Sequence, residues 1–349
     1  MVYKKTFDTY RTVAKNCLAN HKNARPEGMT MPIGALKVRR EGKTEAYNEM
    51  AKALTDLGKS HPIPRKIPRS VHRTTDEALG ILLSDLHVGK FAEIDNEVVF
   101  SVDIAIQRIK QIVQNARHLW DDYMREVHHI EDIHLFLVGD IIDGEQIYAT
   151  QTWNSELPVI KQVSLAAEVL KTNLLAWASK EFSNVWVHSV QGNHGEIRTS
   201  GGSTAFHWQT NFDTLLAKML EFGCSSLDNV FFDIGYDQLH IARIPKYKSK
   251  DEHKFFLMHK TPQHPQTAAG RSKFGGWLQR FGVDAFLTGH YHNARFENFN
   301  GVPIAYNGAL FGSADDYTMN LAFDGFPSQL LFSISDKRPL AHWWLVDLR

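Results

Sequence analysis

The sequence has only two cysteines among its 349 residues, and it has no hydrophobic run long enough to cross a membrane. Cys17 and Cys224 cannot form a disulfide framework and lack zinc-finger spacing, which excludes small disulfide-stabilised secreted folds. A membrane helix needs about 20 consecutive apolar residues. The first residues also lack the apolar segment of a secretory signal. We therefore expect a cytoplasmic protein without a membrane partner.

The sequence also lacks an excess of charge of either sign, because 39 Lys and Arg residues balance 39 Asp and Glu residues. The distribution is uneven: residues 1–75 carry 16 basic and 6 acidic residues, whereas residues 76–349 carry 23 and 33. A basic segment favours a polyanionic partner, since Lys and Arg contacts to phosphate drive non-specific nucleic-acid binding. The alternative is a solvated linker, or a segment that docks on the protein's own acidic surface.

Two regions are predicted. Residues 1–75 combine two weak helix candidates with a proline-spaced basic stretch, so they form a basic N-terminal appendage that binds nucleic acid or packs on the rest of the chain. Residues 76–349 form the catalytic domain, with strands and helices in the first half and mostly strands in the second. The chain is long enough for one large domain with such an appendage.

Local patterns place several elements of this domain. Ser101 is expected to cap a long helix that ends near Val127. A second helix is expected over residues 205–222, and strands at residues 230–233 and 238–243 are expected to form a hairpin. After a polar, basic insertion, residues 276–281 are expected to be helical.

Five strand-like apolar runs each end in side chains that can bind a metal ion. Strands of open α/β sheets present their chemistry at their carboxyl ends, and residues i and i+2 of an extended chain project to one side. Each piece alone is more typical of a surface turn, but together they predict one site. In chain order the endings are Asp85-Leu86-His87, Gly139-Asp140-Ile141-Ile142-Asp143, Gly192-Asn193-His194, His259 and Gly289-His290-Tyr291-His292.

The side-chain types indicate the chemistry of this site. Imidazole, carboxylate and amide ligands together favour Mn, Fe or Zn over thiophilic metals. A carboxylate such as Asp140 can bridge two cations about 3.5–4 Å apart, the spacing used in two-metal phosphoester hydrolysis. The sequence therefore predicts a two-metal hydrolytic site.

The motif order Asp-x-His, Gly-Asp-x-x-Asp, Gly-Asn-His, His and Gly-His-x-His resembles the calcineurin-like metallophosphoesterase superfamily from residue 79 to about residue 310. The resemblance implies an α/β fold, a four-layer sandwich of two mixed β-sheets flanked by helices. It also implies catalytic roles for Asp140 and for His194, which would protonate the leaving oxygen, and a supporting role behind the ligands for Asp143. Asp140 would be shared by two metal positions, one formed by Asp85, His87, Asp140 and His292, the other by Asp140, Asn193, His259 and His290.

One position departs from the superfamily pattern. Gly195 stands where many members have an acidic residue that orients the histidine, so Glu196 is expected to take that role, or the loop is open for a larger substrate. Substrate contacts are expected from a further set of polar residues. The candidates are Arg198, Arg271 and Lys273 for phosphate and Tyr148 for base stacking.

Within the superfamily, the form Asp85-x-His87-x-Gly89 resembles DNA double-strand-break repair nucleases and phage-encoded relatives. Together with the basic segment, it predicts a dinuclear-metal phosphodiesterase, most simply a DNA nuclease or exonuclease that uses a metal-bridging hydroxide. Two Mn²⁺ ions are the favoured cofactors, with Fe, Zn, Ni or Mg as alternatives. The 57 residues after His292 leave no room for the capping domain and ATPase-binding tail of the repair enzymes, so no ATPase partner is expected.

Two other functions fit the same residues. The first is a phosphatase, or a phosphodiesterase acting on small molecules or cyclic nucleotides. The second is a nucleic-acid-binding protein whose active site is retired, although no ligand of the pattern is missing. The sequence leaves open the exact substrate, exonuclease against endonuclease cleavage and its polarity, the native metal and a homo-oligomeric state.

Overall fold

The computed structural model describes part of the chain in detail. It covers Asn48, Lys52 and Asp56 as isolated positions, and then residues 77–125, 128, 130–147, 151–198, 210–261, 264–313 and 325–349. Contacts divide the chain into residues 1–49 and residues 50–349, and every helix and strand given below belongs to the second unit. The boundary predicted near residue 75 and nearly all of the basic region before it lie outside the described residues, so both stay predictions.

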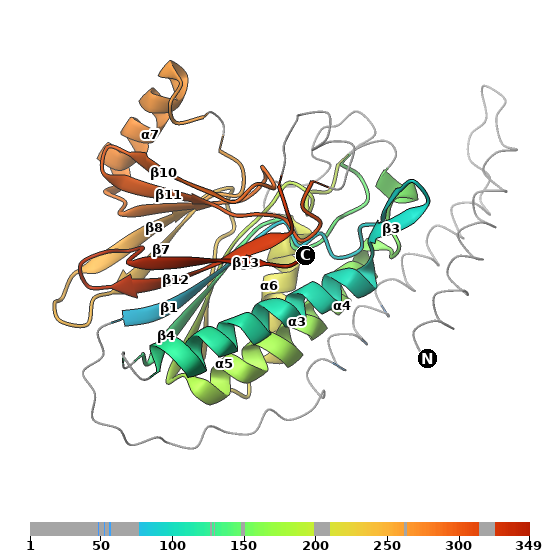
Figure 1. The fold of residues 1–349 in the computed structure, drawn as a ribbon, viewed down its shortest axis with the longest axis horizontal. Coiled ribbons are helices and arrows are strands. Elements are labelled where there is room, and N and C mark those ends of the chain that lie inside the picture. The colour runs from blue at the N-terminus through green and yellow to red at the C-terminus, as the bar shows by residue number, and fades with distance from the viewer. Residues whose placement is uncertain are drawn as a thin grey trace, which may run out of the picture. The chain divides into compact units, whose positions relative to one another are not determined.

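Two mixed β-sheets form the centre of this unit (Figure 1). The six-stranded sheet has the order β13 (His342–Asp347), β12 (Ser328–Ser335), β1 (Glu77–Leu83), β4 (Asp132–Val138), β5 (Asn184–Val190) and β6 (Val230–Ile234). The five-stranded sheet has the order β10 (Arg295–Phe299), β11 (Val302–Tyr306), β9 (Ala285–Thr288), β8 (Glu252–Leu257) and β7 (His240–Pro245). A separate pair joins β2 (Ala92–Ile94) to β3 (Glu97–Phe100).

Helices cover the outer faces of both sheets (Figure 1). Those on the six-stranded sheet are α3 (Val102–His118), α4 (Val159–Val169), α5 (Ala176–Glu181) and α6 (Phe212–Gly223), while α7 (Ala268–Phe281) packs on the five-stranded sheet. Short π-helical turns, Leu119–Met124 and Leu170–Leu175, follow α3 and α4, and Gln151–Trp153 forms a 3₁₀ turn. No helix among the described residues is long and apolar enough to cross a membrane.

Alternation along the strands creates the layers. Successive side chains of a strand point to opposite faces. In β1, Leu79 and Ile81 therefore join the core under the helices, whereas Ala78 and Leu82 join the core between the two sheets. The predicted four-layer α/β sandwich is confirmed.

The predicted cap of the first long helix is confirmed, but the predicted pairing of two strands is wrong. The Ser101 hydroxyl accepts a hydrogen bond from the Ile104 N–H at 3.3 Å, as a helix cap should. The hairpin predicted for residues 230–243 is wrong, because β6 pairs in parallel with β5 while β7 pairs with β8 in the other sheet. The second half of the polar insertion is also helical, since α7 begins at Ala268, eight residues before the predicted start, with Thr267 as its cap.

A chain of buried polar side chains crosses the strands between the sheets. His134 Nδ1 lies 3.0 Å from His188 Nε2, and His188 Nδ1 lies 3.0 Å from Asp233 Oδ2. Both histidines are 2% exposed. Burial lowers the pKa of His134 well below its ordinary value, and the neighbouring His188 adds to the effect. Burial also lowers the pKa of His188, although Asp233 opposes it.

We expect the protein to lose stability as the pH falls below about 6.5, the pKa of an unfolded histidine. Below that value the unfolded chain takes up a proton that folded His134 does not accept, so the unfolded state is favoured by up to about 2 kcal/mol at pH 5. Thermal unfolding between pH 8 and pH 5 measures the slope. His134→Phe should reduce the slope, leaving the part due to the other buried histidines, and the exposed control His118→Ala should not change it; equal slopes for wild type and His134→Phe would contradict the assignment.

Candidate metal centre

The predicted metal ligands lie in tight turns directly after strands rather than in extended backbone. Five of them have a positive φ angle: Asp85 (52°), His87 (44°), Asp140 (52°), His290 (72°) and His292 (55°). Left-handed backbone costs a residue other than glycine on the order of 1–3 kcal/mol, and it persists only where the surroundings enforce it. The side chains converge because of these turns, not through the i, i+2 geometry of a strand.

Backbone hydrogen bonds join the turn after β1 to the turn after β4. The Asp85 N–H donates to the Gly139 carbonyl at 3.2 Å, and the His87 N–H donates to the Asp140 carbonyl at 3.1 Å. At Gly139, with φ of 72°, a Cβ atom would lie 2.5 Å from Gly192 Cα. Glycine is therefore required where the turns after β4 and β5 meet.

The turns bring all the predicted histidine and aspartate ligands together. Three overlapping groups have ligand atoms within 4.8 Å of one another: Asp85, His87 and His292; His87, Asp140 and His194; and Asp140, His259 and His290. Asp140 belongs to the second and third groups and His87 to the first and second, so the three groups form one connected cluster. A connected cluster of this kind has the donors for two neighbouring metal positions.

Unsatisfied polar atoms test whether these residues fit cations. Four buried atoms of the predicted ligands make no hydrogen bond: His87 Nε2, Asp140 Oδ2, Asn193 Oδ1 and His259 Nε2. His259 Nε2 and Asp140 Oδ2 are 2.8 Å apart without hydrogen-bond geometry, close to the roughly 3 Å between neighbouring ligands on an ion with bonds of about 2.1 Å. Each unmet buried group costs about 1–3 kcal/mol. Nitrogen and oxygen donors aimed at a common centre fit borderline divalent cations.

The opposite edges of the two histidine rings are anchored. His87 Nδ1 lies 3.0 Å from Asp143 Oδ1, and His259 Nδ1 donates to the Val138 carbonyl at 2.8 Å. Such contacts fix the tautomer and leave the lone pair of Nε2 for a ligand bond. Asp143 therefore occupies the supporting position expected from its motif.

The histidines of the centre differ in their protonation. Burial lowers the pKa of His87 to about 4 and that of His290 to about 3, so both rings are neutral near pH 7. Burial would also lower the pKa of His259, but the Asp140 and Asp85 carboxylates raise it to about 10. A cation held between His259 and these carboxylates would replace that proton.

His194 lies beside this cluster with its ring held on one side. Its backbone N–H donates to Asp140 Oδ1 at 2.7 Å, and its Nδ1 lies 2.6 Å from the Asp143 carbonyl oxygen. The short contact to a carbonyl assigns the proton to Nδ1. Gln151 Nε2 also binds the Asp143 carbonyl and lies 3.2 Å from His194 Nδ1. This arrangement leaves Nε2 for proton exchange.

The expectation that Glu196 orients His194 differs from the structure. Glu196 pairs with Arg198, whose Nε lies 2.8 Å from Glu196 Oε2, and the contacts on the His194 ring come from Asp143 and Gln151 instead. A two-residue spacing allows the Glu196–Arg198 pair to form locally, which sequence analysis did not consider. The phosphate candidate Arg198 is therefore held in an ion pair.

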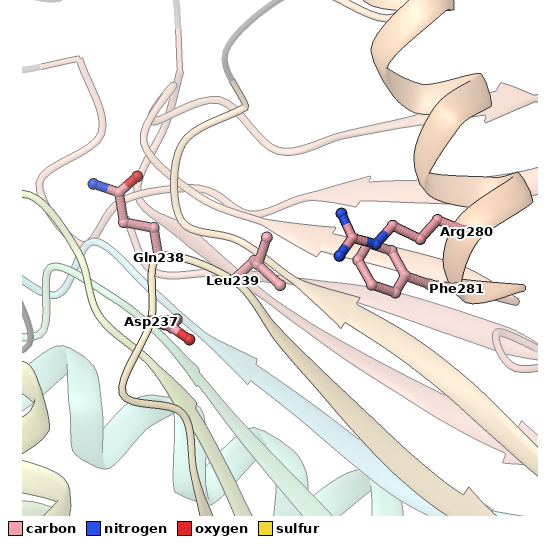
Figure 2. A pocket seen from close by; sticks show the side chains of 5 residues that line it. All are labelled: Asp237, Gln238, Leu239, Arg280 and Phe281. Atoms are coloured by element: carbon pink, nitrogen blue, oxygen red, sulfur yellow. The ribbon is translucent and has the colours of Figure 1, made fainter.

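The other substrate candidates are two basic residues and one tyrosine. Arg271 and Lys273 are exposed on α7, the helix that packs on the outer face of the five-stranded sheet. Tyr148 lies outside the described residues. A separate cavity of about 530 Å³ is lined by Asp237, Gln238 and Leu239 before β7, and by Arg280 and Phe281 at the end of α7 (Figure 2). Among the described residues, none of the predicted site residues lines this cavity.

Sequence analysis missed the residues that brace the turns. Gln329, from β12, accepts a hydrogen bond from the Ser84 N–H at 3.2 Å and donates to the Ser84 carbonyl at 3.0 Å, next to Asp85. Asp213, near the start of α6, binds the turns after β4 and β5. Burial and the charge of Asp140 raise the pKa of Asp213 to about 6. Because this helix was predicted to start at residue 205, its cap, Asn211, was not recognised in the sequence.

The fold and the site together define a metal-dependent phosphoesterase. The sequence profile of calcineurin-like phosphoesterases matches residues 81–294, more than half of the chain. The chain therefore belongs to the calcineurin-like phosphoesterase family. Among curated proteins, none matches the sequence.

Several solved structures are similar to this chain. Vacuolar protein sorting 29 from Cryptosporidium parvum is 15% identical, with 74% of this chain and 86% of that chain covered and a TM-score of 0.35. An archaeal phosphodiesterase is 12% identical, with coverages of 77% and 99% and a TM-score of 0.35. Phosphopantetheinyl hydrolase from Mycobacterium tuberculosis is 12% identical, with coverages of 67% and 90% and a TM-score of 0.30. The family assignment rests on the sequence profile.

Proposed function

We propose that the protein is a two-metal phosphodiesterase that cleaves nucleic acid, with DNA as the substrate. The observation that carries the hydrolytic part is the set of buried, unsatisfied ligand atoms around Asp140. The substrate part rests on the Asp85-x-His87-x-Gly89 form of the first motif and on the excess of basic residues in residues 1–75.

Seven side chains would hold the metals, in the two positions that share Asp140. When bound, two divalent cations supply a water of lowered pKa as the nucleophile and positive charge that neutralises the phosphate. Mn²⁺ fits the mixed nitrogen and oxygen donors, as Fe and Zn also do. The ligands are Asp85, His87 and His292 on one side, and Asn193, His259 and His290 on the other.

His194 handles the proton of the leaving group. The Asp143 carbonyl binds its Nδ1–H at 2.6 Å and holds the ring, so a proton on Nε2 can be delivered to the departing oxygen. The Asp143 carboxylate, 3.6 Å from His194 Nδ1, stabilises the ring while it is protonated. A DNA diester needs this help because its leaving group is an alkoxide, which departs poorly without a proton.

We expect the purified chain to hydrolyse bis-p-nitrophenyl phosphate and to digest DNA when Mn²⁺ is present, and to lose both activities with a chelator. Turnover and digestion of single- and double-stranded DNA are measured with Mn, Mg, Zn and Ni. The absence of DNA digestion with every metal would contradict the nuclease proposal.

The same screen includes cyclic nucleotides and phosphoproteins, which separates the proposal from its alternatives. Diester turnover without DNA cleavage would favour a small-molecule phosphodiesterase. Nucleic-acid binding without hydrolysis of any phosphoester, despite bound metal, would favour a retired active site.

A further inference from the structure

The start of α6 holds the two turns that carry Asp140 and Asn193. Asp213, the second residue of the helix, is 5% exposed. Its Oδ2 accepts hydrogen bonds from the Asp140 N–H at 3.0 Å and the Gly192 N–H at 2.9 Å, and its Oδ1 accepts one from the Ile141 N–H at 3.1 Å. One buried carboxylate therefore bonds to the ends of two different strands.

Two neighbours of Asp213 complete this contact. The Nδ2 of Asn211, the helix cap, donates to the Gly192 carbonyl at 2.9 Å, so both backbone polar groups of Gly192 are bound to the start of α6. The Phe212 N–H donates to the Gly195 carbonyl at 2.8 Å. The two residues between these glycines are the predicted metal ligand and the predicted proton donor.

The ladder of the sheet cannot set this spacing. The last paired residues of β4 and β5 are Val138 and Val190, and the predicted ligands lie beyond them. A functional site needs its side chains placed to within about 0.5 Å, which requires contacts outside the ligands themselves. Hydrogen bonds to a carboxylate are stronger than those between neutral groups, so Asp213 is suited to hold both turns.

We propose that Asp213, supported by Asn211, is a positioning residue that sets the distance between Asp140 and Asn193 and thereby the affinity of the metal position these residues share. The proposal rests on the proposed function. We place Asp213 outside the metal ligands because its two carboxylate oxygens accept hydrogen bonds from three backbone N–H groups.

The test is Asp213→Asn, which keeps the shape and removes the charge and one acceptor. Calorimetric titration with Mn²⁺ should show one of two sites weakened by about 10–100-fold, the range for residues that orient metal ligands. The turnover of bis-p-nitrophenyl phosphate should fall at low Mn²⁺ and recover at high Mn²⁺, with KM nearly unchanged. Such metal rescue is not expected from a purely structural loss.

Asp336→Asn is the matched control. Its carboxylate accepts hydrogen bonds from two consecutive backbone N–H groups, of Tyr247 at 2.7 Å and Lys248 at 2.8 Å, just as Asp213 does with Asp140 and Ile141. It follows β12, at the end of the sheet where β1 begins, opposite the metal centre. The control should keep both Mn²⁺ affinities.

Wild-type Mn²⁺ affinities in Asp213→Asn would overturn the proposal. A wild-type chain that binds no Mn²⁺ would instead overturn the proposed function, so the two failures are distinguishable. If Asp213→Asn does not fold by circular dichroism, Asn211→Ser replaces it, because serine keeps the helix cap and removes only the bond to the Gly192 carbonyl. One weakened site supports the proposal, and two unchanged sites overturn it.

Discussion

Asp140→Ala is expected to empty or disorder both metal positions and to reduce hydrolysis to the uncatalysed level. Asp140 belongs to two of the three ligand groups, and its Oδ2 is buried 2.8 Å from His259 Nε2. Its Oδ1 also accepts the His194 N–H, so the substitution loosens the proton donor as well. Elemental analysis of metal content, beside turnover of bis-p-nitrophenyl phosphate, measures both effects.

Asp95→Ala is the control for backbone strain in this experiment. Asp95 has the same φ of 52° as Asp140, but it lies exposed in the turn between β2 and β3. An alanine there tolerates left-handed backbone as poorly as at Asp140, so any loss due to strain alone appears in both variants. Two tightly bound metals in Asp140→Ala would show that Asp140 is not shared.

The candidate metal ligands could be identified from the sequence because the motifs that contain them are short and local. Each ligand follows a strand that an apolar run marks, as at residues 133–138 before Asp140, and the order of the motifs carries the family resemblance. The four-layer sandwich was predicted from that resemblance, because a period of two assigns each side chain to a face of its strand but does not arrange the strands into sheets. The motifs therefore supplied the candidate ligands, and the family resemblance that they carry supplied the sandwich.

The partners of the strands, and the residues that hold the turns in place, could not be predicted in the same way. Alternation assigns β6 and β7 to faces but not to partners, so adjacent strands of the chain were taken as a hairpin although they belong to different sheets. Asp213 acts through three backbone groups up to 73 residues away in sequence, and no local pattern encodes such contacts. Glu196 was misjudged because its ion pair with Arg198 competes with the predicted contact.

His194→Ala should separate chemistry from metal binding. The variant keeps the backbone N–H that donates to Asp140, and the seven predicted ligands remain, so both metals should stay bound. Loss of a positioned proton donor should lower DNA cleavage by about 10²–10⁴-fold. Hydrolysis of bis-p-nitrophenyl phosphate should fall less, because nitrophenolate departs without protonation.

The alternative is that His194 binds metal itself, since it lies close enough to His87 and Asp140 to share a metal ion with them. If His194 were itself a ligand, His194→Ala would lose metal as Asp140→Ala does, and turnover of both substrates would fall together. Gln151→Ala is the intermediate case, because it removes the side chain that shares the Asp143 carbonyl with His194, together with the acceptor of the Ile147 N–H, and leaves the His194 ring in place. We expect Gln151→Ala to keep its full metal content and to cleave DNA at a rate between those of wild type and His194→Ala. That result would show that His194 acts through its ring and not through a bond to metal.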